Sequence, residues 1–173
     1  MNEKSLEVCI LAAGFGKRMR SNTPKVMQSL AGRPLLGHLI NSVEKLNPDK
    51  IHVVVGPEID AVRQSFPSQN INWVTQTARL GTGHAVRVAL EQLNSSDSMV
   101  LVLFGDVPLV TLETLQKLLN ESKGYSVSVL TAIVPDPGGL GRIIRDENGE
   151  QIVNMGGGIG SFGSQGACVY GYC

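Results

Sequence analysis

The sequence lacks the features that mark a nucleic-acid-binding, membrane or disulfide-rich protein. Its 15 lysine and arginine residues are balanced by 15 aspartate and glutamate residues, so no chain-wide field attracts nucleic acid or an anionic membrane. The apolar stretch after "MNEKSLE" is too short for a signal-peptide core or a membrane span. The three cysteines, Cys9, Cys168 and Cys173, have no metal-binding or redox spacing. We therefore expect a cytoplasmic protein with no nucleic-acid or membrane partner, in which Cys9 is a small buried hydrophobe.

The 173 residues are enough for one ordinary domain, and 42% hydrophobic and 17% charged residues are typical of a globular chain. Buried strand patterns alternate with amphipathic helix patterns, which predicts an α/β fold with a mostly parallel sheet covered on both faces. The predicted strands are 7–13, 51–56, 72–75, 99–106 and 126–134, with hairpin strands at 141–146 and 150–154, and the predicted helices are 34–46, 58–66, 83–93 and 111–122.

The last 20 residues break this alternation. The stretch 154–173 reads "NMGGGIGSFGSQGACVYGYC", which is rich in glycine, uncharged and without a period. Such a composition is typical of flexible or disordered extensions. We expect residues 1–153 to form the domain and 154–173 to be a disordered tail of unrelated origin.

The segment "LAAGFGKRMRSNTPK", from Leu11 to Lys25, follows the first predicted strand. Its small residues would let backbone N–H groups approach an anion, and its basic residues would supply countercharge. The small residues are Ala13, Gly14 and Gly16, and the basic ones are Lys17, Arg18, Arg20 and Lys25. A solvated basic turn would explain the charges but not Pro24, which fixes the chain just before Lys25. The segment contains neither the ATPase-type phosphate loop nor the dinucleotide fingerprint, so a polyphosphate loop of another type is expected.

Asp106 follows the apolar run "MVLVLF" at the carboxyl end of another predicted strand. A carboxylate there is a common Mg²⁺ ligand, because Mg²⁺ prefers one or two carboxylates plus substrate phosphate oxygens. A turn-capping role for Asp106 is the alternative. Ligands in open α/β sheets bind beyond the carboxyl ends of the strands, so the loop after Ala12 and Asp106 are expected to share one pocket.

Two glycine-containing segments are further candidates. In "QTARLGTGHA", the amide of Gln76 with Gly81 and Thr82 could read a base edge, although an N-cap at Thr82 in a plain loop explains the pattern nearly as well. His84 is expected to be a surface residue at the helix start, while His38 and His52 are expected to be structural. In "DPGGLGRI", Gly141 could bring backbone close to a substrate or simply form a hairpin connection.

Together these segments resemble the sugar-nucleotide pyrophosphorylases, and within them the uridyltransferase domains that act on N-acetylglucosamine 1-phosphate. The signature L-A-A-G-x-G-x-R-M followed by P-K stands here as "LAAGFGKRM" and "TPK". The segments "QTARLGTGHA", "FGDVPL" and "DPGGLGRI" match later blocks in order and spacing, and the agreement runs from Val8 to Val153. The resemblance implies a Rossmann-like, three-layer nucleotide-diphosphosugar transferase fold, truncated in its C-terminal part.

The resemblance also implies residue roles. Arg18 and Lys25 would be the catalytic residues that hold the triphosphate, and Asp106 would hold Mg²⁺. The remaining substrate contacts would come from Leu11, Ala12, Ala13, Gly14, Gln76, Gly81, Thr82, Phe104, Gly105 and Gly141, with Gln76, Gly81 and Thr82 on uracil and Gly141 on the amino sugar.

The implied reaction joins UTP and N-acetylglucosamine 1-phosphate into UDP-N-acetylglucosamine and pyrophosphate, a step of cell-wall precursor synthesis. No covalent nucleophile is needed, since the sugar phosphate attacks the α-phosphorus directly. Two alternatives remain open: a pyrophosphorylase for another sugar phosphate, and a catalytically inactive fragment or nucleotide-binding module.

The sequence departs from the family pattern near its end. Asn154 stands where the family has a glutamate that helps bind the sugar. The family's following residues, including an asparagine that completes the metal site, and its trimerising acetyltransferase domain have no counterpart here. We therefore expect this chain not to assemble as the full-length family does.

Overall fold

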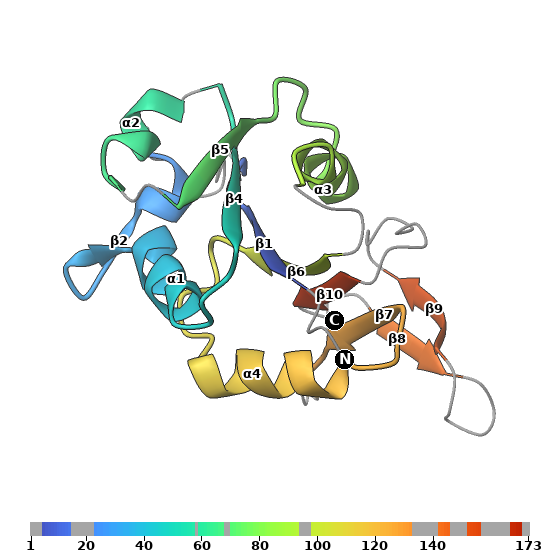
Figure 1. Cartoon of the computed structure of the whole chain (residues 1–173). Helices are drawn as coiled ribbons and strands as arrows, with labels where there is room; N and C mark the ends of the chain where they lie inside the picture. The colour runs from blue at the N-terminus through green and yellow to red at the C-terminus, as the bar shows by residue number, and fades with distance from the viewer. Residues whose placement is uncertain are drawn as a thin grey trace.

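The computed structural model describes residues 5–14, 23–57, 59–67, 70–93 and 98–132, together with the backbone of three later strands. Within these residues a six-stranded sheet has the order β5-β4-β1-β6-β10-β7, and every neighbouring pair is parallel (Figure 1). The strands are β1 (Leu6–Leu11), β4 (Lys50–Val55), β5 (Ile71–Thr75), β6 (Met99–Phe104), β7 (Val127–Leu130) and β10 (Ala167–Tyr170). This confirms the predicted α/β fold with a parallel sheet.

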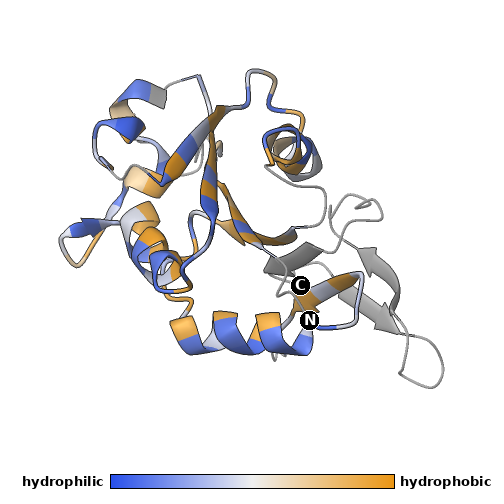
Figure 2. Ribbon diagram, in the orientation of Figure 1, coloured by the Kyte–Doolittle hydropathy of each residue, from blue (hydrophilic) through white to orange (hydrophobic). Residues whose placement is uncertain are grey.

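Helices cover both faces of this sheet, because each has an apolar stripe at helical spacing. The helices are α1 (Leu35–Glu44), α2 (Ile59–Arg63), α3 (Thr82–Leu90) and α4 (Leu112–Glu121). In α1 the four stripe residues, Leu36, Leu39, Ile40 and Val43, are all buried. Figure 2 shows the same pattern in α4, with apolar residues toward the sheet and polar residues outward. The predicted cap of α4 is confirmed, since Thr114 N donates to Thr111 Oγ1 at 3.2 Å.

The core has two parts, one on each face of the sheet. Strand β1 contributes to both, because its side chains alternate: Val8 and Ile10 pack with α1, α2 and α4, while Cys9 and Leu11 pack with α3. Among the described residues, α3 is the helix that covers this second face. None of the described helices is long and apolar enough to cross a membrane.

Two small two-stranded sheets accompany the main one. A short 3₁₀ helix, η2 (Lys25–Met27), leads into the antiparallel pair β2 (Ser29–Leu30) and β3 (Arg33–Pro34), which the sequence did not indicate. The strands β8 (Arg142–Arg145) and β9 (Ile152–Gly156) pair antiparallel and confirm the predicted hairpin.

The stretch 154–173 differs from the expectation of disorder at two places. Strand β9 extends into it, and β10 lies between β6 and β7 as a parallel strand of the main sheet. The segment "ACVY" is short and is flanked by glycines, so its composition hid a strand that long-range pairing with β6 and β7 stabilises.

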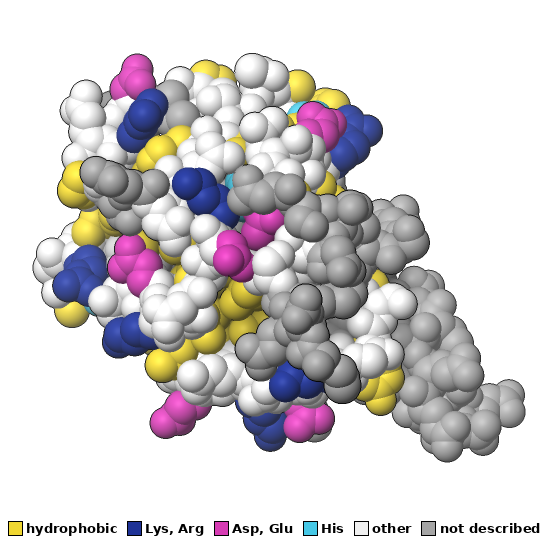
Figure 3. All heavy atoms as spheres, in the orientation of Figure 1, with side chains coloured by type: hydrophobic (Ala, Val, Ile, Leu, Met, Phe, Trp, Pro, Cys, Tyr) yellow, Lys and Arg dark blue, Asp and Glu magenta, His cyan; other side chains and the backbone are white. Residues whose placement is uncertain are grey.

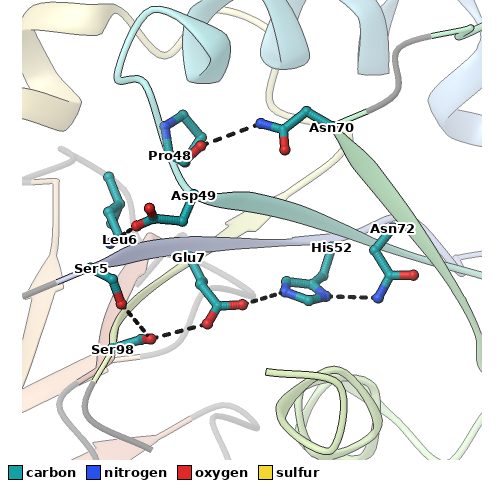
Figure 4. Close-up of polar contacts among 9 residues, drawn as sticks. All are labelled: Ser5, Leu6, Glu7, Pro48, Asp49, His52, Asn70, Asn72 and Ser98. Atoms are coloured by element: carbon teal, nitrogen blue, oxygen red, sulfur yellow. Dashed lines mark hydrogen bonds and ion pairs between the residues drawn. The ribbon is translucent and has the colours of Figure 1, made fainter. Parts of the chain in front are cut away.

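A row of buried and half-buried polar side chains crosses the α3 face near the amino ends of the strands (Figure 4). His52 Nε2 lies 2.7 Å from Glu7 Oε2, and both side chains are only 1% exposed. Asn72 Nδ2 lies 3.1 Å from His52 Nδ1, and Ser98 Oγ donates to Glu7 Oε1 at 3.0 Å. His52 is therefore structural, as expected, and the row ties β5, β4, β1 and β6 together.

The order of the sheet fixes where a ligand site can form. Strand β1 has β4 on one side and β6 on the other, so the chain continues from β1 toward β4 and later returns to β6. Such a reversal opens a crevice beyond the carboxyl ends of the two central strands. The polar row of Glu7 and His52 lies at the opposite edge.

Candidate active site

Backbone hydrogen bonds link the carboxyl ends of β5, β4, β1 and β6 in turn. Ala12 N donates to Val54 O at 2.7 Å, and Gln76 N donates to Val55 O at 2.8 Å. On the other side of β1, Gly105 N donates to Leu11 O at 2.9 Å. The loops that follow these strands therefore leave the same edge of the sheet, as the sequence predicted.

The described start of the loop after β1 offers its backbone rather than its side chains. Leu11 and Ala12 are 9% and 5% exposed, and their side chains belong to the core on opposite faces. Ala13 O accepts a hydrogen bond from Arg79 Nε at 3.1 Å, which links this loop to the turn after β5. Gly14 is exposed. A Cβ atom at Gly14 would meet nothing within 4 Å, so the main chain is not covered there by the described residues.

Gly105 occupies a position where a side chain would not fit easily. A Cβ atom there would lie 3.1 Å from Val26 Cγ1, 3.2 Å from Leu11 O and 3.3 Å from Ala12 Cβ. The preceding Phe104 packs its side chain against the core on the α3 face, so its backbone is the part that faces the site edge. Gly105 thus allows the close approach of β6, η2 and β1 at this edge.

Lys25 and Asp106 come together across the site, although they are 81 positions apart. Pro24 precedes η2 with φ −52° and ψ 142°, and the burial of Val26 fixes the short helix against the core. Lys25 Nζ donates to Asp106 Oδ2, and the side chains are 39% and 30% exposed. An ammonium and a carboxylate thus face each other where a charged ligand could reach both.

Gln76, Gly81 and His84 form a second polar cluster at the same edge. Gln76 is 3% exposed, and its Nε2 atom donates to Gly81 O at 3.1 Å and lies 2.9 Å from His84 Nδ1. Gly81 is the N-cap of α3 with φ 101° and ψ −179°, a conformation nearly restricted to glycine. Because α3 begins at Thr82, the alternative in which Thr82 is the N-cap is wrong.

The structure thus brings most of the predicted site residues to one edge of the sheet. These residues are Leu11, Ala12, Ala13, Gly14, Lys25, Gln76, Gly81, Thr82, Phe104, Gly105 and Asp106. Arg18 and Gly141 lie outside the described residues, and the roles of all these residues stay predictions.

Sequence reasoning missed two residues. Arg79 bonds Ala13 O, and His84, expected at the surface, is partly buried against Gln76. Arg79 lies between Gln76 and Gly81 in the segment "QTARLGTGHA", so the sequence could have indicated it as a candidate site residue. The contact of His84 depends on how the turn folds back, which the sequence alone does not indicate.

The side chains at this edge of the sheet can be compared with the ligands that a divalent cation needs. Within the described part of the chain, no group of three or more histidine, cysteine, aspartate or glutamate side chains could hold a metal ion. Asp106 alone offers a partly exposed carboxylate beside the phosphate-loop candidate. One carboxylate plus substrate phosphate oxygens is a donor set that suits Mg²⁺, so the site fits a cation that arrives with a nucleotide.

The described charged side chains on one face of the molecule are of both signs. Figure 3 shows basic and acidic side chains interspersed over the described part of one face. This agrees with the balanced composition of the chain.

A parallel sheet covered by helices on both faces, with the Lys25–Asp106 pair at the carboxyl end of β6, defines a protein of the α/β class. The chain belongs to the MobA-like NTP transferase family, whose domain matches residues 8–140. It is 50% identical over 145 residues to the bifunctional protein GlmU of Pseudomonas paraeruginosa. That alignment covers 84% of this chain and 32% of the relative, so the chain spans about a third of its length. The sequence resemblance to nucleotide transferases is confirmed.

Solved structures agree at the level of the fold. HddC from Yersinia pseudotuberculosis, complexed with GMP-PN, matches with a TM-score of 0.65 and 23% identity, over 88% of this chain and 69% of that protein. Rv0371c from Mycobacterium tuberculosis, in complex with manganese, matches with a TM-score of 0.61 and 19% identity, over 75% of this chain and 66% of that protein.

Proposed function

We propose that the chain transfers a uridylyl group from UTP to N-acetylglucosamine 1-phosphate, forming UDP-N-acetylglucosamine and pyrophosphate. The observation that carries this proposal is that the Lys25–Asp106 pair and the Gln76 turn lie at the same edge of the sheet, on either side of the loop after β1, which Arg79 of the turn bonds at Ala13 O. The 50% identity to GlmU over this segment and the match of "LGTGHA" to the uridyltransferase pattern support the choice of base and sugar. The product would serve cell-wall precursor synthesis in the cytoplasm.

This reaction requires the protein to position the two substrates and to neutralise the charge of their phosphates. An oxygen of the sugar phosphate forms a bond to the α-phosphorus of UTP, and the bond from that phosphorus to the β-phosphate oxygen breaks to release pyrophosphate. The backbone of residues 11–14 would hold the nucleotide, and Lys25, with Arg18, would offset the charge that grows on the leaving phosphates. Gly141 would face the amino sugar.

Asp106 is the residue that would hold Mg²⁺. The cation, when bound with the triphosphate, supplies positive charge that stabilises the transferring and leaving phosphates. A cation held by the Asp106 carboxylate would weaken the ion pair with Lys25, so the ammonium would be available to the phosphates.

A second candidate is nucleotide binding without turnover. It is favoured by Asn154, which lies in β9 at the position where the resemblance places a sugar-binding glutamate. An asparagine keeps hydrogen-bonding capacity but loses the negative charge. The nucleotide half of the site does not depend on this residue.

The proposal is tested by incubating the 173-residue chain with UTP, N-acetylglucosamine 1-phosphate and Mg²⁺, and measuring pyrophosphate together with UDP-N-acetylglucosamine by mass spectrometry. Glucose 1-phosphate and mannose 1-phosphate serve as competing acceptors. Formation of UDP-N-acetylglucosamine in preference to the other products supports the proposal. UTP binding without any pyrophosphate release supports the second candidate, and preference for another sugar phosphate contradicts the assigned acceptor.

A further inference from the structure

The side-chain amide of Gln76 is held on two sides by the turn that follows it. Its Nε2 atom bonds Gly81 O at 3.1 Å and His84 Nδ1 at 2.9 Å. These partners come from the N-cap and the first turn of α3, while the backbone of Gln76 is fixed to β4 through Val55 O. The amide is therefore fixed by the strand on one side and the helix on the other.

The nature of the partners determines which way the amide points. Gly81 O is a carbonyl oxygen and can only accept, so the atom that faces it must be the NH₂ group of Gln76. The second hydrogen of that NH₂ group then points to His84 Nδ1, which has to accept it. His84 is therefore the tautomer that carries its proton on Nε2.

Both hydrogens of the Gln76 amide are used in this arrangement, while its oxygen makes no hydrogen bond to the described residues. No described residue donates a hydrogen bond to Gln76 Oε1. No buried side-chain nitrogen or oxygen in the described part of the chain lacks a partner, so Oε1 must keep contact with solvent despite the 3% exposure of the residue. Gln76 consequently presents an acceptor at the site edge and no donor.

We propose that His84 is a positioning residue that fixes the Gln76 amide with its oxygen toward the ligand, so that the site selects a nucleobase with a ring N–H donor. This inference rests on the proposed binding of a nucleotide at this edge. Without the His84 acceptor, the NH₂ group would keep one protein partner instead of two, and the amide could turn its NH₂ toward the ligand. Selection between donor and acceptor edges would then weaken.

The chemistry of the bases gives this proposal a direct probe. Uracil carries a hydrogen on N3, whereas cytosine has an unprotonated N3 that accepts. N3-methyl-UTP keeps the sugar, the triphosphate and both carbonyl groups of UTP but has no ring N–H. An acceptor fixed at Gln76 Oε1 therefore favours UTP over both CTP and N3-methyl-UTP.

The variants are His84→Leu, which removes the acceptor, and His84→Asn, whose side-chain oxygen can replace Nδ1. Arg87→Leu, at an exposed position of the same helix, is the matched control. Calorimetry measures the dissociation constants of the three nucleotides for each 173-residue protein. We expect His84→Leu to reduce the preference for UTP by roughly three- to tenfold, the effect of one neutral hydrogen bond, and His84→Asn and Arg87→Leu to retain it.

If His84 had only a structural role, His84→Leu would lower the affinity for all three nucleotides by the same factor. An unchanged preference for UTP in a His84→Leu protein that binds UTP overturns the inference and leaves the proposed function intact. Absence of nucleotide binding by the unaltered protein contradicts both. NMR of the free protein gives an independent readout: we expect unprotonated Nδ1 on His84, and two well-separated Gln76 amide hydrogens that converge in His84→Leu. A proton on Nδ1 overturns the inference.

Discussion

Lys25 and Asp106 form an ion pair that closes the edge of the sheet between η2 and the end of β6. Each is the other's counterion in the free protein, and each has a proposed partner in the substrate complex. A nucleotide phosphate would attract Lys25, and a cation bound to that nucleotide would attract Asp106. Binding of the metal and of the nucleotide should therefore be coupled, since either partner alone leaves one of the two charges exposed.

Asp106→Asn tests the proposed metal contact separately from the other contacts of the site. The amide keeps the size of the side chain but is a weaker ligand for Mg²⁺ and a weaker partner for Lys25, so we expect UTP affinity to fall in the presence of Mg²⁺ and to stay the same or rise in EDTA. Calorimetry under both conditions measures the difference. An equal loss of affinity with and without the metal would instead indicate a role in folding.

Lys25→Met is the complementary change. It removes a contact to phosphate that the ion pair with Asp106 opposes, so UTP affinity should fall by about 1.5–3 kcal/mol in Mg²⁺, as for a charged hydrogen bond, and by less in EDTA. Lys117→Met, on the exposed side of α4, is the control for loss of one positive charge. A similar effect in both variants would reduce the role of Lys25 to a general electrostatic one.

Arg18→Ala tests the predicted contact to the departing phosphates. Loss of such a contact typically costs ~2–4 kcal/mol of transition-state stabilisation, so kcat/KM should fall strongly while the melting temperature stays the same. Arg20→Ala, in the same basic loop, is the control. Unchanged turnover of an Arg18→Ala protein would remove this residue from the catalytic set.

Gly105→Ala tests the tight packing between β6, η2 and β1. The new Cβ would lie within 3.1–3.3 Å of three atoms, so we expect a loss of stability of about 1–3 kcal/mol. Gly14→Ala is the control for stability, because a Cβ there meets nothing within 4 Å. Urea unfolding measures both, and equal stability of the two variants would show that the edge adapts freely.

Much of this site was predictable, because the strands that carry it are locally encoded. Strand β6 is a continuous apolar run, so the place of Asp106 at its end followed from the sequence alone. Contacts that depend on tertiary folding did not follow. The pairing of His52 with Glu7 and the insertion of β10 between β6 and β7 need the sheet order before they can be seen, and the contact of His84 with Gln76 needs the fold of the turn between them.

The pH dependence of stability offers a test of the core beneath the site. Burial raises the pKa of Cys9 from its ordinary value of 9.0 to about 12. Above pH 9 the unfolded thiol loses its proton while the folded thiol keeps it, so this group lowers stability as pH rises, by up to ~1.4 kcal/mol per pH unit. Between pH 8 and 10 under reducing conditions, the unaltered protein should lose more stability than Cys9→Ala in urea unfolding. Parallel losses would mean that the thiol is accessible to solvent.

The measurement that tests the account most directly is calorimetric titration of the 173-residue chain with UTP in the presence and absence of Mg²⁺. A nucleotidyltransferase site built on Lys25, Asp106 and the Gln76 turn predicts saturable binding of one UTP per chain, tightened by Mg²⁺ and stronger than the binding of CTP. Absence of binding, or equal binding of every nucleotide regardless of the metal, would contradict it.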